Sequence, residues 1–258
     1  MRFIKFFHIK LSSASMQEII DRVDVNLQNK REKILITSVN AAMLVISRND
    51  RVITDAINAS DIVNIDGMSV FYSLRLLGFK TPERIAGPDI FYNLVKLCAQ
   101  KGYKPYFLGA RAQVLEAMSS RFKSEFGNLE IAGFHHGYYS DNQTDNIIKD
   151  IEESKADMLF LGITSPKREI FTNRYFQTSS VPVWKGVGGS FDIYANFTKR
   201  APKWIQKIGM EWFYRLCQEP KRMWKRYLVT NTVFIKMILG EFGRKTFKGE
   251  QRVFMEDI

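Results

Sequence analysis

The stretch ADMLFLGI, residues 156–163, is apolar except for Asp157, and the polar sequence TSPKRE, residues 164–169, follows it directly. A short run that is apolar on both alternating faces is typical of a strand covered on both sides. Sheets covered in this way are usually parallel, because the helices that connect their strands pack on both faces. The stretch therefore predicts a buried parallel strand, with the polar residues at the carboxyl edge of the sheet.

Five further stretches have the same character, and helical patterns separate them. The predicted strands are 33–39, 61–66, 104–110, 129–134, 156–163 and 181–188, and the predicted helices are 41–58, 67–77, 88–101, 111–126, 142–153 and 166–178. This alternation indicates an α/β fold with a Rossmann-like, mostly parallel sheet and helices on both faces. A further strand and helix are expected before it, at 6–11 and 15–28.

The chain has 258 residues, which suffice for one large domain with an appendage. We expect an α/β catalytic domain at 1–198, a basic helical appendage at 199–240 and a polar tail at 241–258. No stretch approaches about 20 uninterrupted apolar residues, so no membrane-spanning helix is predicted. The apolar run at the start is too short for a signal peptide. The two cysteines lack metal or redox spacing, which fits a cytoplasmic protein.

The formal net charge is +11, which points to an anionic partner such as nucleic acid, a membrane surface or a phosphorylated substrate. Residues 199–240 hold ten Lys and Arg but only two acids. On a helix over 221–228, the four basic residues would share one arc, opposite the apolar residues. Such a helix is either packed on the domain with a solvated basic face or lies on anionic lipid through its Trp and its charges.

Polar residues follow two of the predicted strands where ligands of parallel sheets usually bind. Asp66 ends the second strand and precedes Gly67, so it is either a helix cap or a general base aimed at a substrate hydroxyl. Ser38 and Asn40 end the first strand, and they either cap a helix or orient a substrate or the Asp66 carboxylate.

The stretches GVGGSFD (186–192) and FLGA (107–110) place glycines where a strand gives way to a helix. Glycine lets backbone N–H groups approach phosphate oxygens, although a tight turn explains it equally well. No metal site is predicted, because His135 and His136 would point to opposite faces of a strand. No Asp-x-Asp pair is present to hold a cation against a diphosphate.

These motifs resemble the WecG/TagA/CpsF glycosyltransferase family, glycosyltransferase family 26, over roughly residues 5 to 230. The matching stretches are NIDGMSVFYSLRLLG (64–78), PERIAGPDIF (82–91), PYFLGA (105–110), GYY (137–139), LGITSPKRE (161–169) and GVGGSFDIYANFTKRAPKWIQKIGMEWFYRLCQEPKR (186–222). The last stretch is long and specific.

The resemblance implies an inverting, metal-independent hexosyltransferase without a cofactor. Its donor would be a UDP-sugar carrying N-acetylmannosamine, the corresponding uronic acid or another hexose, and the residues do not single out one sugar. Its acceptor would be a sugar on undecaprenyl diphosphate, used for teichoic acid, capsule or exopolysaccharide synthesis. The enzyme would be peripheral at the inner face of the bacterial plasma membrane, and a homo-oligomer is compatible with this.

The resemblance also assigns roles to residues. Asp66 takes the place of the catalytic base, with Asn40 and Ser38 beside it. Arg168 stands where the family has Gln, so that residue's role in donor selection does not transfer. The expected substrate-binding residues are Thr37, Arg84, Gly109, Tyr138, Lys167, Arg168, Gly188, Gly189 and Asp192. Those expected at the acceptor or the membrane are Arg215, Arg222, Lys225, Trp212 and Trp224.

Two other functions fit parts of the sequence. A nucleic-acid-binding protein would explain the basic and aromatic residues, but no helix-turn-helix, RNA-recognition or zinc pattern supports it. A UDP-binding module that has lost activity would explain the fold, but Asp66 and Asn40 argue against it. We therefore expect a UDP-sugar, a lipid-linked acceptor and an anionic membrane surface as partners, and no nucleic acid.

Overall fold

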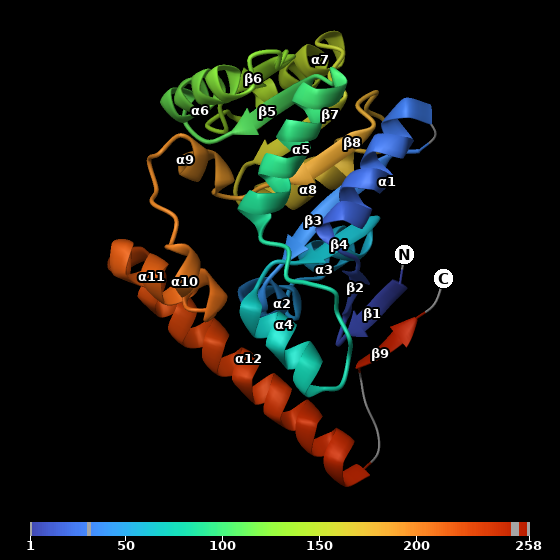
Figure 1. Ribbon diagram of the computed structural model, residues 1–258, viewed down its shortest axis with the longest axis vertical. Coiled ribbons are helices and arrows are strands. Elements are labelled where there is room, and N and C mark those ends of the chain that lie inside the picture. The colour runs from blue at the N-terminus through green and yellow to red at the C-terminus, as the bar shows by residue number, and fades with distance from the viewer. Residues whose placement is uncertain (1, 30–31, 249–252, 257–258) are drawn as a thin grey trace.

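The computed structural model describes residues 2–29, 32–248 and 253–256. The side chains of Arg222, Arg226 and all residues after 244 are not part of that description. A six-stranded sheet forms the centre of the molecule (Figure 1). Three further strands form a small separate sheet near the N-terminus.

The central sheet is parallel throughout, in the order β4-β3-β8-β7-β5-β6. Its strands are β3 (Ile34–Val39), β4 (Ile62–Ile65), β5 (Pro105–Gly109), β6 (Gly133–His135), β7 (Met158–Gly162) and β8 (Val183–Gly186). Five of the six lie within a stretch predicted as a strand, so the α/β prediction is confirmed. The prediction at 129–134 was too early, because β6 covers only Gly133–His135 and residues 129–132 precede it without strand structure. The chain adds β4 on one side of β3, then forms β5, β6 and β7 on the other side, and finally inserts β8 between β3 and β7. The carboxyl ends of β3, β4 and β8 therefore come together.

Helices connect these strands and cover both faces, as predicted. They are α1 (Met16–Asn29), α2 (Ala41–Ser47), α3 (Arg51–Asn58), α4 (Met68–Leu76), α5 (Gly87–Lys101), α6 (Ala112–Glu125), α7 (Thr144–Glu153), α8 (Lys167–Tyr175) and α9 (Ser190–Tyr194), with a 3₁₀ turn at Asp141–Gln143. The helix predicted at 41–58 is two helices, because the Asp50 side chain accepts a hydrogen bond from Ile53 N and starts α3.

The core has a layer on each face of the sheet. On one face, Phe91 of α5 packs against Phe107, Phe160 and Phe191, beneath α1, α5, α6 and α9. On the other face, Trp184 of β8 packs with aromatic rings of α8. Strand residues alternate between the two layers, which explains why most positions on both faces of the inner strands are apolar.

The strand predicted at 6–11 was wrong, because it runs across the turn of a hairpin. Strands β1 (Arg2–Phe6) and β2 (Ile9–Ser13) pair antiparallel, and Phe7 between them has a positive φ of 57°. Strand β9 (Val253–Glu256), from the segment predicted as a tail, pairs with β1.

Three helices follow the α/β part: α10 (Lys203–Lys207), α11 (Glu211–Gln218) and α12 (Pro220–Lys248). The 29-residue α12 runs across the boundary predicted at residue 241 and lies along the outside of α2 (Figure 1). Its Phe234 and Ile238 are buried in the cluster formed by α2, α3, α4 and the hairpin. Among the described helices, none has the length and apolar character needed to cross a membrane.

Candidate active site at the carboxyl edge of the sheet

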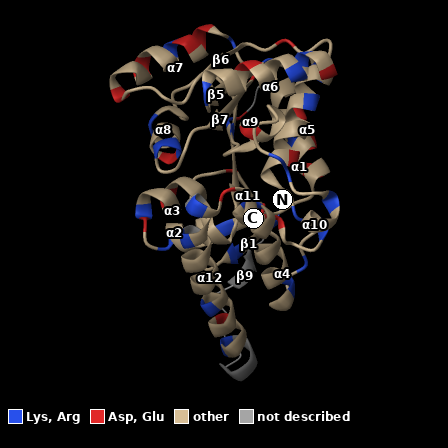
Figure 2. Ribbon diagram, turned by 90° about the vertical axis from the view of Figure 1, so that its left-hand side faces the viewer, with Lys and Arg blue, Asp and Glu red and all other residues tan. Residues whose placement is uncertain are grey.

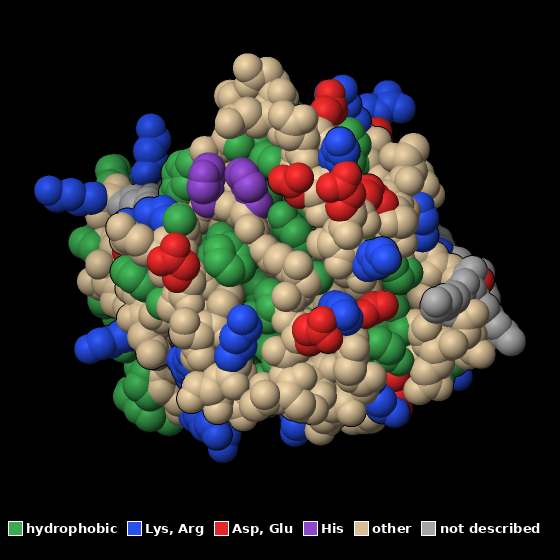
Figure 3. Space-filling view, turned by 90° about the horizontal axis from the view of Figure 1, so that it is seen from above, with side chains coloured by type: hydrophobic (Ala, Val, Ile, Leu, Met, Phe, Trp, Pro, Cys, Tyr) green, Lys and Arg blue, Asp and Glu red, His purple; other side chains and the backbone are tan. Residues whose placement is uncertain are grey.

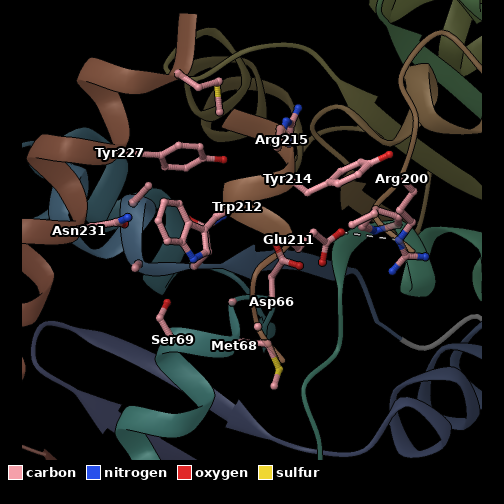
Figure 4. Close-up of a pocket in the computed structure, with 18 of the residues that line it drawn as sticks. Asp66, Met68, Ser69, Arg200, Glu211, Trp212, Tyr214, Arg215, Tyr227 and Asn231 are labelled. Carbon is pink, nitrogen blue, oxygen red and sulfur yellow. Dashed lines mark ion pairs between the residues drawn. The ribbon is translucent and has the colours of Figure 1, made fainter. Parts of the chain in front are cut away.

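A cavity of about 370 Å³ lies between the carboxyl ends of β3 and β4 and the helices α11 and α12 (Figure 4). Its wall is charged near the sheet and mostly apolar along α12. The lining side chains used below are those of Asn40, Asp66, Met68, Arg84, Arg200, Glu211, Trp212, Arg215, Met223, Tyr227, Phe234 and Ile235.

Asp66 lies directly after β4, and its side chain borders this cavity. Its Oδ1 accepts a hydrogen bond of 2.8 Å from Gly87 N, the first residue of α5. Asp66 is therefore not the cap of α4, whose N-cap is Gly67 without a side-chain hydrogen bond. The hydrogen bond from the start of α5 holds one oxygen of the Asp66 carboxylate. This bond fixes the orientation of the Asp66 side chain toward the cavity.

Asn40 lines the same cavity from the end of β3. Its Oδ1 caps α2 by accepting a hydrogen bond of 3.1 Å from Met43 N. A Cβ placed on Gly67 would lie 3.0 Å from the Asn40 Cβ, so glycine allows the two strand ends to approach each other. Asn40 and Asp66 are brought together as the sequence predicted.

Ser38 and Thr37 point to opposite faces of β3. The Ser38 Oγ donates to Asn64 Oδ1 at 2.9 Å and accepts from the Lys185 Nζ at 2.7 Å, beneath the start of α5. The Thr37 hydroxyl instead bonds Ser60 at 2.8 Å on the other face. Neither residue lines the main cavity, but Ser38 lies on the Asp66 side of the strand, because a Cβ built on Gly87 would be 3.9 Å from both Ser38 Oγ and Asp66 Oδ1.

Arg84 ties the Asp66 segment to the appendage. Its Nε donates to Asp66 O at 2.6 Å, and its Nη2 donates to Glu211 Oε2 at 2.6 Å. Arg200 donates to both carboxylate oxygens of Asp89. Its Nε lies 3.7 Å from Glu211 Oε1, an ion pair drawn in Figure 4. Glu211 of α11 therefore bridges two arginines of the cavity.

Arg215 of α11 extends toward the glycines that follow β8. A Cβ built on Gly189 would lie 3.1 Å from the Arg215 Nη2. The Arg215 Nε is buried and has no hydrogen-bond partner. This guanidinium thus joins the cavity to the glycine loop, where two backbone amides and a cation could surround a phosphate.

The family model for the glycosyl transferase WecG/TagA/CpsF family matches residues 4–247. The chain belongs to the WecG/TagA/CpsF family. It is therefore a glycosyltransferase, of the hexosyltransferase class, as the motifs predicted.

Two curated relatives are N-acetylglucosaminyldiphosphoundecaprenol N-acetyl-beta-D-mannosaminyltransferases. The one from Bacillus subtilis strain 168 is 30% identical over 240 residues, which are 93% of each chain. The one from Bacillus spizizenii strain W23 is 34% identical over 172 residues, which are 67% of this chain and 66% of the relative.

The other WecG/TagA/CpsF motif residues lie along the carboxyl edge, outside the main cavity. Lys167 donates to Tyr139 O at 2.7 Å, and Arg168 pairs with the buried Glu169. Gly188 has a positive φ of 54° in the turn after β8, and Asp192 lies on α9. Tyr138 is 74% exposed after β6.

Gly109 has a packing explanation. Its φ is 140°, and a Cβ at this position would lie 2.3 Å from the Gly162 carbonyl carbon of β7. Only glycine fits between β5 and β7 there, whatever the residue does for a substrate.

The residues expected at the acceptor or the membrane also fall into two groups, those that line the cavity and those that are exposed. Trp212 and Arg215 line the cavity, whereas Trp224 is 55% exposed on α12 and Lys225 is also exposed. Arg222 lies on α12, and its side chain is outside the described part of the structure.

Two histidines lie next to each other on the upper surface, where acidic and basic side chains are mixed (Figure 3). The rings of His135 and His136 are 4.6 Å apart, and His135 Nδ1 is hydrogen-bonded to His136 O. Within residues 2–29, 32–248 and 253–256, no three His, Cys, Asp or Glu side chains are grouped as metal ligands.

Sequence reasoning missed Lys185, Arg200 and Glu211. Lys185 carried a signal, because it is the one charged residue in the predicted strand VPVWKGVG (181–188). Arg200 and Glu211 carried none, since exposed charges are common in basic helical segments and their pairing depends on the fold.

Proposed function

We propose that the protein transfers N-acetylmannosamine from a UDP-linked donor to N-acetylglucosamine on diphosphoundecaprenol, with inversion at the anomeric carbon. One feature of the site supports this proposal. The main cavity combines the Asp66 carboxylate, three arginines and an apolar wall. A lipid-linked sugar has three corresponding parts, namely a hydroxyl, a diphosphate and a hydrocarbon chain. Both Bacillus relatives are named for an acceptor of this kind, N-acetylglucosaminyldiphosphoundecaprenol.

In the proposed reaction, Asp66 acts as general base. Its free carboxylate oxygen takes the proton of the acceptor hydroxyl, and the hydroxyl oxygen forms a bond to the anomeric carbon of the donor. The bond from that carbon to the phosphate oxygen breaks, and UDP leaves with the electron pair. A single displacement inverts the anomeric centre, so an α-linked donor gives the β-linkage that the relatives' names contain.

The charge on the departing UDP needs stabilisation. The Arg215 guanidinium lies beside Gly189, next to the turn at Gly188, which makes this edge the proposed site of the donor diphosphate. The amides of Gly188 and Gly189 would bind the diphosphate together with Arg215. Lys167, Arg168 and Asp192 lie along the same edge and would contact the rest of the donor. Arg84 and Arg200 are the proposed partners of the acceptor diphosphate.

The appendage is the proposed contact with the membrane. Trp204 is 65% exposed, and Ile208, Trp224 and Leu228 are also exposed. Lys and Arg residues are distributed along α10 and α12 (Figure 2). Aromatic and aliphatic side chains beside cations are suited to the interface of an anionic bilayer. A peripheral position at the inner face of the plasma membrane would bring the cavity to its lipid acceptor.

A transfer assay with a panel of donors tests the proposal. Purified protein is incubated with a short-chain N-acetylglucosaminyl diphospholipid and either UDP-N-acetylmannosamine, its uronic acid or UDP-glucose, and products are identified by mass spectrometry. We expect one added N-acetylmannosamine. Transfer of the uronic acid alone would assign another sugar and give Arg168 a part in its recognition. No transfer from any donor would overturn the proposed acceptor.

A further inference from the structure

Lys185 is a fully buried lysine at the centre of the sheet. It lies near the carboxyl end of β8, opposite Ile36 of β3 and Phe160 of β7, and its exposed fraction is 0%. Lysine is almost never fully buried without a partner, because an ammonium loses its hydration in the interior. A core position that any apolar residue could fill holds a charge instead.

The ammonium reaches the polar side chains of the two neighbouring strands. Nζ donates to Ser38 Oγ at 2.7 Å, and Asn64 Oδ1 lies 3.5 Å away. The Ser38 hydroxyl has one proton, which it gives to Asn64 Oδ1. Lys185 therefore fixes the orientation of Ser38, because the hydroxyl accepts from the lysine and donates to the amide.

This set of hydrogen bonds continues to the segment that holds Asp66. Asn64 Nδ2 donates to Ile85 O at 2.8 Å, and Gly87, two residues later, donates to Asp66 Oδ1. A Cβ on Gly87 would be 3.9 Å from both Ser38 Oγ and Asp66 Oδ1. The lysine, the serine and the carboxylate thus all lie under the first turn of α5.

Two charged groups face Lys185, Asp66 from the end of β4 and Arg168 from α8. Burial lowers the pKa of Lys185, the Asp66 carboxylate raises it, and Arg168 lowers it, to give about 7. Arg168 is itself paired with Glu169. The Lys185 amino group therefore changes between its charged and neutral forms near neutral pH.

We propose that Lys185 is a positioning residue of the transfer reaction, which orients Ser38 and Asn64 and places a positive charge behind the Asp66 carboxylate. This rests on the proposed function, in which Asp66 is the base. Both substrates bring a diphosphate to this edge of the sheet. A cation behind the base offsets that negative charge, and ordered neighbours keep the carboxylate in one orientation.

The test is Lys185→Met, which keeps an unbranched side chain one atom shorter than that of lysine and removes the charge. The variant is expected to fold, because Ser38 and Asn64 remain bonded to each other. We expect kcat to fall about tenfold or more, while KM for either substrate changes less than about threefold. In the unaltered protein, kcat should decline as the pH rises through about 7, because Lys185 loses its proton. This alkaline decline should be absent in Lys185→Met.

Two further variants make the test specific. The control Lys33→Met removes a lysine that lies directly before β3, away from the cavity, and donates to the carbonyl oxygen of Phe176. It should leave kcat and the pH profile unchanged. In a Ser38→Ala background, Lys185→Met should have a much smaller effect, since the two residues act together.

The outcomes separate two failures. Suppose that Asp66→Asn is inactive in the same assay, as the base assignment requires. A wild-type kcat in Lys185→Met, or a persistent alkaline decline in that variant, would then overturn the role of Lys185 alone. If Asp66→Asn is as active as the unaltered protein, the base assignment itself is wrong.

Discussion

Asp66 is the residue on which the proposed chemistry depends. Asp66→Asn retains the shape of the side chain and an oxygen for Gly87 N, but it cannot accept the proton of the acceptor. We expect transfer to fall about 10²–10⁴-fold, the usual contribution of a positioned base. Isothermal titration should show unchanged UDP binding, because the proposed donor contacts lie after β8. Near-normal turnover would remove Asp66 from this role.

Lys185 should also affect stability in a pH-dependent way. Its pKa is lowered from 10.5 to about 7 in the folded protein, so between these values the unfolded chain binds a proton that the folded chain lacks. The free energy of unfolding of the unaltered protein should therefore rise with pH across this window. The same rise should be missing in Lys185→Met.

The size of this effect follows from the difference in pKa. At about 1.4 kcal/mol for each pKa unit, a few kcal/mol are involved. Urea unfolding at pH 7, 8 and 9 measures it. Lys185→Met should be the more stable protein at pH 7, and its advantage should shrink as the pH rises. Parallel curves for the two proteins would contradict the buried, titrating lysine. Greater stability with lower activity would identify a residue retained for function.

One carboxylate of helix α11 binds two arginines of the cavity. Glu211 binds Arg84 and lies next to Arg200, and Arg84 also holds the Asp66 carbonyl. Glu211→Gln removes the charge from the hydrogen bond with Arg84, which contributes about 1.5–3 kcal/mol when charged, and from the ion pair with Arg200. We expect amide hydrogen exchange in α11 to accelerate about tenfold or more and transfer to fall by a similar factor.

The matched control is Glu116→Gln, an exposed glutamate on α6. It should change neither measurement. Unchanged exchange in Glu211→Gln would show that the apolar contacts of α11 and α12 are sufficient to hold the appendage in place.

Helix α12 carries the proposed membrane contact on its exposed surface. Lys221 and Lys225 are exposed there, beside Trp224 and Leu228. Each basic residue near anionic lipid contributes roughly 1 kcal/mol. Changing both lysines to Glu should therefore weaken binding to phosphatidylglycerol vesicles by at least about tenfold in a sedimentation assay, with little change on phosphatidylcholine.

A charge-matched control separates this contact from the net charge of +11. Lys96→Glu with Lys123→Glu makes the same change on exposed positions of α5 and α6, outside α10–α12. Vesicle binding of this variant should stay close to normal. Equal losses in both variants would mean that general attraction, and not α12, determines binding.

In the proposed reaction, the molecule as a whole must balance the charge of two diphosphates. The proposed site does this with Arg84, Arg200 and Arg215 of the cavity and with the amides of Gly188 and Gly189 beside it. Transfer is therefore expected to continue in excess EDTA at an unchanged rate. Loss of activity with chelator and recovery with Mg²⁺ or Mn²⁺ would show that a cation supplies this charge.

Local patterns were sufficient for the central sheet. The strands inside the sheet are short, mostly apolar runs because both faces are covered, and this condition is visible within the run itself. The edge strand β6 is only partly covered, and its bounds were predicted less well. Asp66 and Asn40 could be predicted as neighbours for a related reason, since they end adjacent strands at the same edge. The hairpin was missed because Phe7 adopts a positive φ that sequence normally assigns to glycine.

Contacts between distant segments were decided only when the chain folded. Strand β9 pairs with β1 from the opposite end of the chain, and Glu211 meets Arg84 across 127 residues. Lys185 reaches Ser38 across 147 residues. Periodicity reports whether a side chain faces the interior, but not which side chain it meets there. A lysine in an apolar strand therefore marks an unusual position, and only the packing of β3, β4 and β8 under α5 gives that position a partner.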